Sequence, residues 1–78
     1  MKHSEISSAF GAVLRRLRKE AGLTQEVLAD GAGITNVYVS KLESGDQQPT
    51  LGTIFSLSAT LNIEPNEFVL QVQTQIKK

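Results

Sequence analysis

Residues 24–45, TQEVLADGAGITNVYVSKLESG, carry the signals for two short helices separated by a sharp turn. Thr24 is a favourable N-cap, because a threonine hydroxyl can accept a hydrogen bond from an unpaired N–H of the first helical turn. Gly33 can adopt the left-handed conformation that ends this helix, and Thr35 can then cap a second helix. Gly45 supplies the second stop. The stretch therefore predicts two helices between which the chain reverses at Gly33.

The first of these helices has a narrow apolar side. Val27 and Leu28 are predicted to be buried, and the small Ala29 and Ala32 would let another helix approach closely. Gly31 does not fit this pattern, because a glycine inside a helix costs roughly 1 kcal/mol relative to alanine. Two interpretations follow: the helix includes Gly31 at that cost, or it ends a residue or two earlier.

The second helix, predicted over about residues 35–44, has an apolar and a polar side. Val39 and Leu42 are expected to face inward, with Ile34 just before the helix. Two helices joined by about three or four residues that include a glycine form the helix-turn-helix unit, whose second helix can enter the major groove of DNA. The side chains left outside are Asn36, Val37, Ser40 and Lys41.

The surrounding sequence resembles one family of DNA-binding domains. From about Phe10 to Phe68 the chain is similar to the phage lambda repressor and Cro-like helix-turn-helix family, also called XRE-type. Its length is similar to that of the controller proteins of restriction and modification systems. The resemblance implies an all-α, compact five-helix bundle that binds DNA. The matching residues are Gln25, Leu28, Ala29, Gly33, Ile34, Val39, Leu42, Glu43, Gly45, Pro49 and Leu51.

Another helix is predicted before the helix-turn-helix unit. Residues 1–6 are expected to be frayed, and Ser7 or Ser8 is expected to cap a helix that runs to about Ala21, after which Gly22 ends it. Its apolar stripe at helical spacing is Phe10, Val13, Leu14, Leu17 and Ala21.

Two more helices are predicted after the unit. Thr50 is expected to cap a helix that runs to about Leu61, and Pro65 to begin one that runs to about Ile76. Because no segment has a β pattern, we expect a single all-α domain over residues 7–76. In the helix capped by Thr50, the fourth along the chain, the core-facing residues are expected to be Leu51, Ile54, Phe55, Leu57 and Leu61.

Composition excludes several function classes. The 78 residues contain no cysteine, and the single histidine, His3, lies in the predicted tail, so no metal site and no cofactor are expected. Glu26 and Asp30 are four residues apart, but a carboxylate site needs a pocket that so small a bundle is not expected to contain, and we expect no enzyme. No apolar run approaches the roughly 20 residues that span a bilayer, so we expect no membrane partner and a cytoplasmic location.

The charges balance, with eight basic and eight acidic residues, which is not the basic excess typical of nucleic-acid binding. Several basic residues are nevertheless grouped on the first helix. A modest basic face predicts weak non-specific binding to DNA, because that binding depends on phosphate neutralisation. The alternative is that this group is only a solvated helix face. Its members are Arg15, Arg16, Arg18 and Lys19.

The second helix of the helix-turn-helix unit would meet base edges with its exposed side if it lay in a major groove. An asparagine amide can pair with adenine, a lysine can donate to guanine, and a valine or threonine methyl can contact a thymine methyl. The resemblance likewise implies base reading at Asn36, Val37 and Lys41. Alternatively, Thr35 is only an N-cap and Val37 only an exposed apolar residue. The predicted base-contacting residues are Thr35, Asn36, Val37, Ser40 and Lys41.

Other residues are candidates for holding DNA phosphates. Gln25 lies in the first turn of its helix, where its amide and nearby backbone N–H groups can bind a phosphate oxygen, as the matching glutamine does in the family. Tyr38 has a competing interpretation as a partly buried packing residue. Asp46 in the following loop would repel phosphate. The predicted phosphate-contacting residues are Gln25, Tyr38, Ser44 and Gln47.

The resemblance also implies an ion pair between Arg18 and Glu43, which would orient the second helix of the helix-turn-helix unit without touching DNA. The fifth helix, predicted from Pro65 to about Ile76, is a candidate surface for a protein partner, because in a monomer some of its apolar residues would be exposed to solvent. The alternative is a monomer whose last turn frays. The predicted dimer-interface residues are Phe68, Val69, Val72 and Ile76.

Two functional hypotheses remain. The first is a sequence-specific transcriptional regulator, a repressor or controller, that binds a palindromic operator in double-stranded DNA as a homodimer and acts by occluding or contacting RNA polymerase. The second is an antitoxin-like or adaptor module that binds another protein. The neutral charge and Asp46 favour the second, whereas Gln25, Asn36 and Lys41 favour the first.

Overall fold

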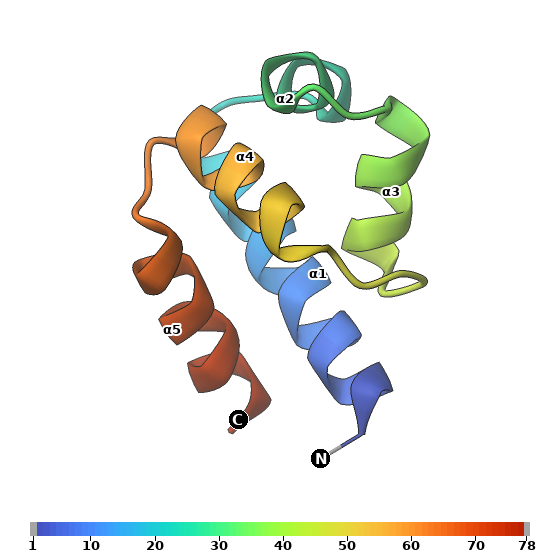
Figure 1. Ribbon diagram of the computed structural model, residues 1–78, viewed down its shortest axis with the longest axis vertical. Helices are drawn as coiled ribbons and strands as arrows, with labels where there is room; N and C mark the ends of the chain where they lie inside the picture. Colours follow the sequence, from blue (N-terminus) through green and yellow to red (C-terminus); the bar gives the residue numbers. More distant parts are fainter. Residues whose placement is uncertain (1, 78) are drawn as a thin grey trace.

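The computed structural model describes residues 2–77, which form five helices and no strand. This confirms the predicted all-α five-helix fold. The helices are α1 (His3–Glu20), α2 (Gln25–Ala32), α3 (Asn36–Ser44), α4 (Leu51–Leu61) and α5 (Pro65–Ile76). α1 runs through the middle of the molecule, with α3 on one side and α5 on the other, while α2 lies across one end (Figure 1).

The ends of the three middle helices are set by their own residues. Each begins at a threonine whose hydroxyl accepts a hydrogen bond from the backbone N–H three residues later, at 3.0–3.1 Å. Each ends at a residue in the left-handed conformation. The N-caps are Thr24, Thr35 and Thr50, and the C-caps are Gly33, Gly45 and Asn62. These local signals place the boundaries where the sequence predicted them.

The start of α1 was predicted wrongly. The helix begins at His3, so neither Ser7 nor Ser8 caps it, and Lys2 at the N-cap makes no side-chain hydrogen bond. Ser7 is buried inside the helix, where its hydroxyl donates to the carbonyl oxygen of His3 at 3.0 Å. A serine can bond back to the preceding turn in this way as readily as it can cap. Of the segment predicted to be frayed, residues 3–6 are helical, and Met1 lies outside the described residues.

The core forms between α1 and the helices on both sides of it. Phe10 of α1 stacks on Phe68 of α5 with ring centroids 5.0 Å apart and ring planes 3° apart. Such aromatic pairs add to the stabilisation that burial already provides. This contact holds α5 against one side of α1. The apolar side chains with no exposed surface are Val13, Leu14, Leu28, Val39, Leu42, Leu57 and Phe68.

Two glycines let helices approach more closely than any other residue would allow. A Cβ atom at Gly11 would lie 2.5 Å from the carbonyl oxygen of Leu42 and 2.6 Å from that of Glu43, so α1 passes directly against the backbone of α3. A Cβ atom at Gly31 would lie 2.6 Å from Cγ2 of Thr60 in α4. Gly31 lies inside α2, so of the two interpretations the one in which the helix includes it is correct. Its lack of a side chain makes room for α4.

Three residues predicted to be buried are exposed instead. Val27, Leu51 and Phe55 retain 50%, 69% and 56% of their accessible surface. The helical periodicity identified an apolar sector but could not show how much of it another helix would cover. α4 packs chiefly against α2 and α5, so Leu57 is buried while Leu51 and Phe55 extend beyond the contact.

Candidate nucleic-acid interface

The turn between α2 and α3 is built from backbone hydrogen bonds. Gly33 has a φ of 71°, and the N–H of Ile34 donates to the carbonyl oxygen of Ala29 at 3.1 Å, which completes the C-terminal cap of α2. Thr35 then caps α3. α2 and α3 are joined by a short turn and lie at one corner of the molecule (Figure 1). The predicted helix-turn-helix unit is therefore present.

α3 has one face in the core and one in solvent. Val39 and Leu42 are completely buried, and the residues predicted to contact bases are all exposed. Positions 36, 37, 40 and 41 are neighbours across one turn, so they share one helix face. The residues on or beside this face are Thr35, Asn36, Val37, Ser40 and Lys41.

Two of these residues bear on the alternatives raised by the sequence. The oxygen of Thr35 accepts the cap hydrogen bond from the N–H of Tyr38, which leaves its hydroxyl proton free to donate. The N-cap role therefore does not compete with a base contact. Val37 retains 64% of its surface, so the fold itself does not use this side chain. Both residues remain available to a ligand that covers α3.

The four residues predicted to hold phosphates differ in their present partners. Gln25 is half-buried and its Nε2 donates to Oε1 of Glu43 at 3.1 Å. The ring of Tyr38 packs against the core while its hydroxyl lies 3.4 Å from the carbonyl oxygen of Gln48. Ser44 donates to the carbonyl oxygen of Lys41 in its own helix. Gln47 is exposed in the loop after α3.

The structure contains an ion pair between Arg18 of α1 and Glu43 of α3. Nε of Arg18 lies 2.6 Å from Oε2 of Glu43 and its Nη2 lies 3.0 Å from Oε1, which is a two-point contact. The side chains retain 11% and 2% of their surface. Nη1 of Arg18 also donates to the carbonyl oxygen of Leu23, 2.8 Å away. The pair therefore ties the end of α3 to α1 and to the segment that leads into α2.

The environment of Arg18 favours its charged form. The hydrogen bond to Glu43 raises the pKa of Arg18 above its ordinary value, burial opposes this effect, and attraction to the carboxylate charge adds to it. Because the pKa is raised, the contribution of the charged guanidinium is fully present at neutral pH and would be lost only as the pH rises through the folded-state pKa.

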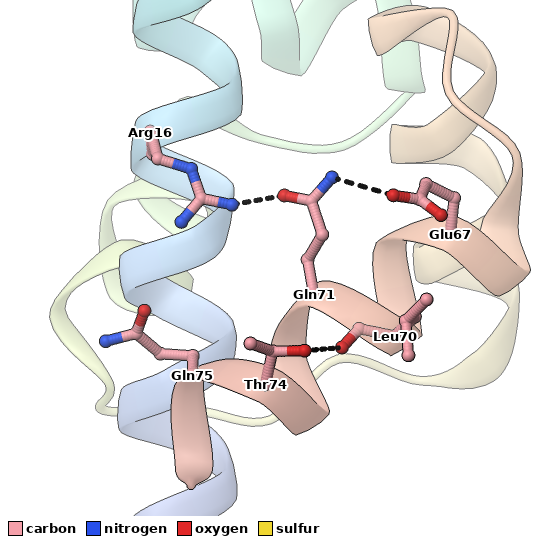
Figure 2. A pocket seen from close by; sticks show the side chains of 6 residues that line it. All are labelled: Arg16, Glu67, Leu70, Gln71, Thr74 and Gln75. Carbon is pink, nitrogen blue, oxygen red and sulfur yellow. Dashed lines mark hydrogen bonds between the residues drawn. The ribbon is translucent and has the colours of Figure 1, made fainter. Parts of the chain in front are cut away.

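The basic group of α1 does not form the single face that was predicted. Arg18 points toward α3, as its pairing shows, whereas Arg16 points toward α5, where it hydrogen-bonds Gln71. Figure 2 shows this guanidinium turned to Gln71, whose amide also reaches Glu67. Residues two apart on a helix project in different directions, so they contact different neighbours. The two basic residues of this group that stay exposed without an ion pair in the described structure are Arg15 and Lys19.

The four residues predicted to form a dimer interface are not equally available. Phe68 is completely buried within the subunit and Val72 retains only 8% of its surface, because both pack toward α1. Ile76 is half-buried and Val69 is 49% exposed. Only part of the predicted interface can therefore reach a partner.

An apolar groove between α4 and α5 was not predicted from the sequence. Its walls combine the two exposed residues of α4 with exposed residues of α5. The signal that could have found it was the excess of apolar positions in residues 51–61. The main apolar residues that line it are Leu51, Ile54, Phe55, Val69 and Leu70.

The described residues contain no group of three or more histidine, aspartate or glutamate side chains placed to hold a metal ion. Among residues 2–77, every helix is too short or too polar to cross a membrane.

Comparison with known sequences places the helix-turn-helix unit in a family. The HTH_3 helix-turn-helix family matches residues 14–68. The chain is 39% identical over 65 residues to y4dJ of Sinorhizobium fredii, an uncharacterised HTH-type transcriptional regulator, and the match covers 83% of this chain and 84% of y4dJ. It is also 39% identical to the HTH-type transcriptional regulator DicA of Escherichia coli over 72% of this chain, but this match spans only 42% of DicA.

Solved structures share the arrangement of helices. The restriction-modification controller protein C.AhdI from Aeromonas hydrophila matches with a TM-score of 0.77 and 40% identity, over 80% of this chain and 94% of that protein. The controller protein C.Esp1396I, solved as a tetramer in complex with its natural 35-base-pair operator, matches with a TM-score of 0.84 and 25% identity, over 94% of this chain and 96% of that one. The chain therefore belongs to the HTH_3, or XRE-type, family of DNA-binding helix-turn-helix transcriptional regulators.

Proposed function

We propose that this regulator binds a palindromic operator as a homodimer, with α3 of each subunit in a major groove. The observation that carries the proposal is that α3 has two different faces. Val39 and Leu42 on its inner face are completely buried, while four residues on its outer face, together with the N-cap Thr35, are exposed and able to contact bases. The buried Arg18–Glu43 pair supports it further, because its two-point contact ties this helix to α1. A rigidly held helix loses less entropy when it binds.

Each residue predicted to contact bases has a chemical role in this proposal. Asn36 pairs with adenine and Lys41 donates to guanine acceptors, since these side chains match those base edges. Val37 packs on a thymine methyl, while the hydroxyls of Thr35 and Ser40 hydrogen-bond nearby groups. An exposed valine beside polar residues is well suited to this surface, because the thymine methyl is the apolar feature of the major groove.

Phosphate contacts would fix the position of α3 in the groove. Gln25 at the start of α2 and Gln47 in the loop after α3 supply neutral N–H donors on either side of the recognition surface. Tyr38 can redirect its hydroxyl from the long contact to Gln48. Ser44 would have to exchange its hydrogen bond within α3 for one to DNA.

The apolar α4–α5 groove supports a dimer. Leu51, Phe55 and Leu70 retain 69%, 56% and 52% of their surface, and a second copy would cover them. In the proposed dimer the two α3 helices would need a spacing of about 34 Å, because that distance matches successive major grooves. The solved operator complex of C.Esp1396I is also an assembly of several subunits. In this proposal Val69 and Ile76 contribute from α5, while Phe68 and Val72 support the interface from within the subunit.

A regulator of this kind would control transcription through its position on DNA. A dimer on an operator that overlaps a promoter excludes RNA polymerase, and one placed beside the promoter can contact it. Because the DNA-binding unit must meet genomic operators, we place the protein in the cytoplasm.

The test is binding of the purified protein to the DNA upstream of its own gene, with a random duplex as competitor, at two salt concentrations. We expect tight binding that resists the competitor, and a loss of about 1–3 kcal/mol in sequence discrimination for Asn36→Ala. For Lys41→Ala we expect weaker discrimination and a smaller dependence on salt. Equal binding to both duplexes, or no binding near physiological salt, would contradict the proposal.

The second candidate function is a protein-interaction module on the same scaffold. The observation in its favour is the α4–α5 groove, which could receive an apolar helix of another protein instead of a second copy. The absence of specific DNA binding, together with a monomer at high concentration, would support this alternative.

A further inference from the structure

Glu43 makes more contacts than an ion pair requires. Its Oε2 accepts from Nε of Arg18 at 2.6 Å, and its Oε1 accepts both from Nη2 of Arg18 at 3.0 Å and from Nε2 of Gln25 at 3.1 Å. The Glu43 side chain is almost completely buried, whereas Gln25 is only half-buried. A buried carboxylate thus lies directly behind a side chain that is proposed to meet DNA.

This contact determines which end of the Gln25 amide faces inward. A carboxylate only accepts hydrogen bonds, so the amide nitrogen and not the amide oxygen must face Glu43. An amide nitrogen carries two hydrogens, and one is used by this bond. If the amide group were rotated by half a turn, its oxygen would lie at the same distance from the carboxylate oxygen, and two acceptors would face each other without a hydrogen. Glu43 therefore selects one of the two orientations and leaves one N–H of Gln25 available.

The start of α2 supplies further donors beside that N–H. Thr24 accepts hydrogen bonds from the N–H groups of Val27 and Leu28, so the earlier N–H groups of Gln25 and Glu26 are the ones left without intrahelical partners. A phosphate can bind such donors at a helix N-terminus. A bare carboxylate nearby would repel a phosphate, but the guanidinium of Arg18 compensates this charge through its two-point contact.

We infer that Glu43, itself held by Arg18, is a positioning residue for DNA: it orients the Gln25 amide so that an N–H faces the phosphate. The inference rests on the proposed DNA-binding function and adds a role to the ion pair, which then orients α3 and prepares a backbone contact on α2. Without the carboxylate, the amide loses its preferred orientation and presents its oxygen to the phosphate part of the time.

A double-mutant cycle tests this coupling. The probe is a DNA duplex selected by the wild-type protein from a random pool, and the variants are Gln25→Ala, Glu43→Gln and the double variant, each shown by circular dichroism to be folded at the assay temperature. In the wild-type background we expect Gln25→Ala to weaken binding about tenfold, the effect of losing one hydrogen bond to a charged group. In the Glu43→Gln background we expect Gln25→Ala to weaken it by about twofold or less.

Gln47 provides a matched control, because it is also an amide proposed to contact phosphate but makes no hydrogen bond to Glu43 in the described structure. Gln47→Ala should change the affinity by the same factor in both backgrounds. If Gln25→Ala has no effect in the wild-type background, or weakens binding equally in both, the inference is overturned while the proposed function stands. If the wild-type protein selects no duplex, the proposed function itself fails.

A measurement on the free wild-type protein does not depend on how the variants fold. The side-chain amide protons of Gln25 should exchange with water more slowly than those of Gln47, because one of them is hydrogen-bonded to Glu43. Equal exchange rates in NMR spectra of the free protein would overturn the inference.

Discussion

Replacing Gly11 with alanine would test whether the close approach of α1 to α3 fixes the position of α3. The added Cβ atom would lie 2.5 Å from the carbonyl oxygen of Leu42 and 2.6 Å from that of Glu43. Close carbon–oxygen contacts across packed helices are about 3.3 Å, so α3 would have to move by about 0.8 Å. Both obstacles are backbone atoms, which cannot rotate away as a side chain can.

Two effects of opposite sign determine the magnitude. Alanine is a better helix former than glycine by about 1 kcal/mol, which alone would stabilise the protein. Forcing an extra methyl group into a close-packed contact typically costs about 1–3 kcal/mol. Because this contact involves two carbonyl groups, we expect the clash to cost about 2–3 kcal/mol, in the upper part of that range, which leaves a net loss of about 1–2 kcal/mol. That corresponds to a fall of about 4–16 °C in Tm for a domain of this size.

The assay is thermal unfolding followed by far-ultraviolet circular dichroism, with Gly52→Ala as the control. Gly52 lies in the first turn of α4, and a Cβ atom there would come no closer than 3.8 Å to Oγ1 of Thr50. The control should therefore leave Tm unchanged or raise it slightly. A Gly11→Ala variant with a Tm equal to or above that of the wild type would refute the argument that this glycine is required for helix packing.

Three other substitutions address the ion pair, the groove and the second close approach. Glu43→Ala should destabilise the fold by about 3–5 kcal/mol, because it leaves the guanidinium buried without its partner; an unchanged Tm would contradict this. If the proposed dimer forms through the groove, Phe55→Ser should raise its dissociation constant at least about tenfold in analytical ultracentrifugation, since aromatic residues are prominent among interface hot spots. Val27→Ser, which removes an exposed residue outside the groove, should not change it. Gly31→Ala should stabilise a Thr60→Ser background by up to about 1 kcal/mol, because Cγ2 of the threonine is then absent; a loss of stability in that background, measured by urea unfolding, would show that another contact limits the approach.

The limits of sequence reasoning are clearest in α4. The apolar spacing of residues 51–61 predicted one wide buried face, but burial depends on how many neighbours a helix has. α4 packs mainly against α2 and α5, so Leu57 is completely covered while Leu51 and Phe55 lie in an open groove. The periodicity of residues 51–61 cannot show how much of α4 is covered, because the covering helices lie outside this segment of the sequence.

The candidate site shows the same division. The outward direction of Asn36, Val37, Ser40 and Lys41 followed from helical spacing, since the positions of Val39 and Leu42 fix which side is buried. The hydrogen bond between Gln25 and Glu43 joins residues 18 apart in the sequence, and no local pattern indicated it. Gly11 offered a signal that was missed: a glycine beside an apolar helical stripe can mark a close helix contact.

What the sequence determined by itself is the set of helix boundaries around the central unit. Thr24, Thr35, Gly33 and Gly45 act on backbone groups within four residues of themselves, so their effects do not depend on the rest of the fold. What only the tertiary structure decided is which side chains meet: whether a serine caps or lies inside a helix, which apolar residues stay open to a partner, and which amide rests on the buried carboxylate. Those outcomes depend on packing between distant segments, where a shift below 1 Å decides whether two groups make contact.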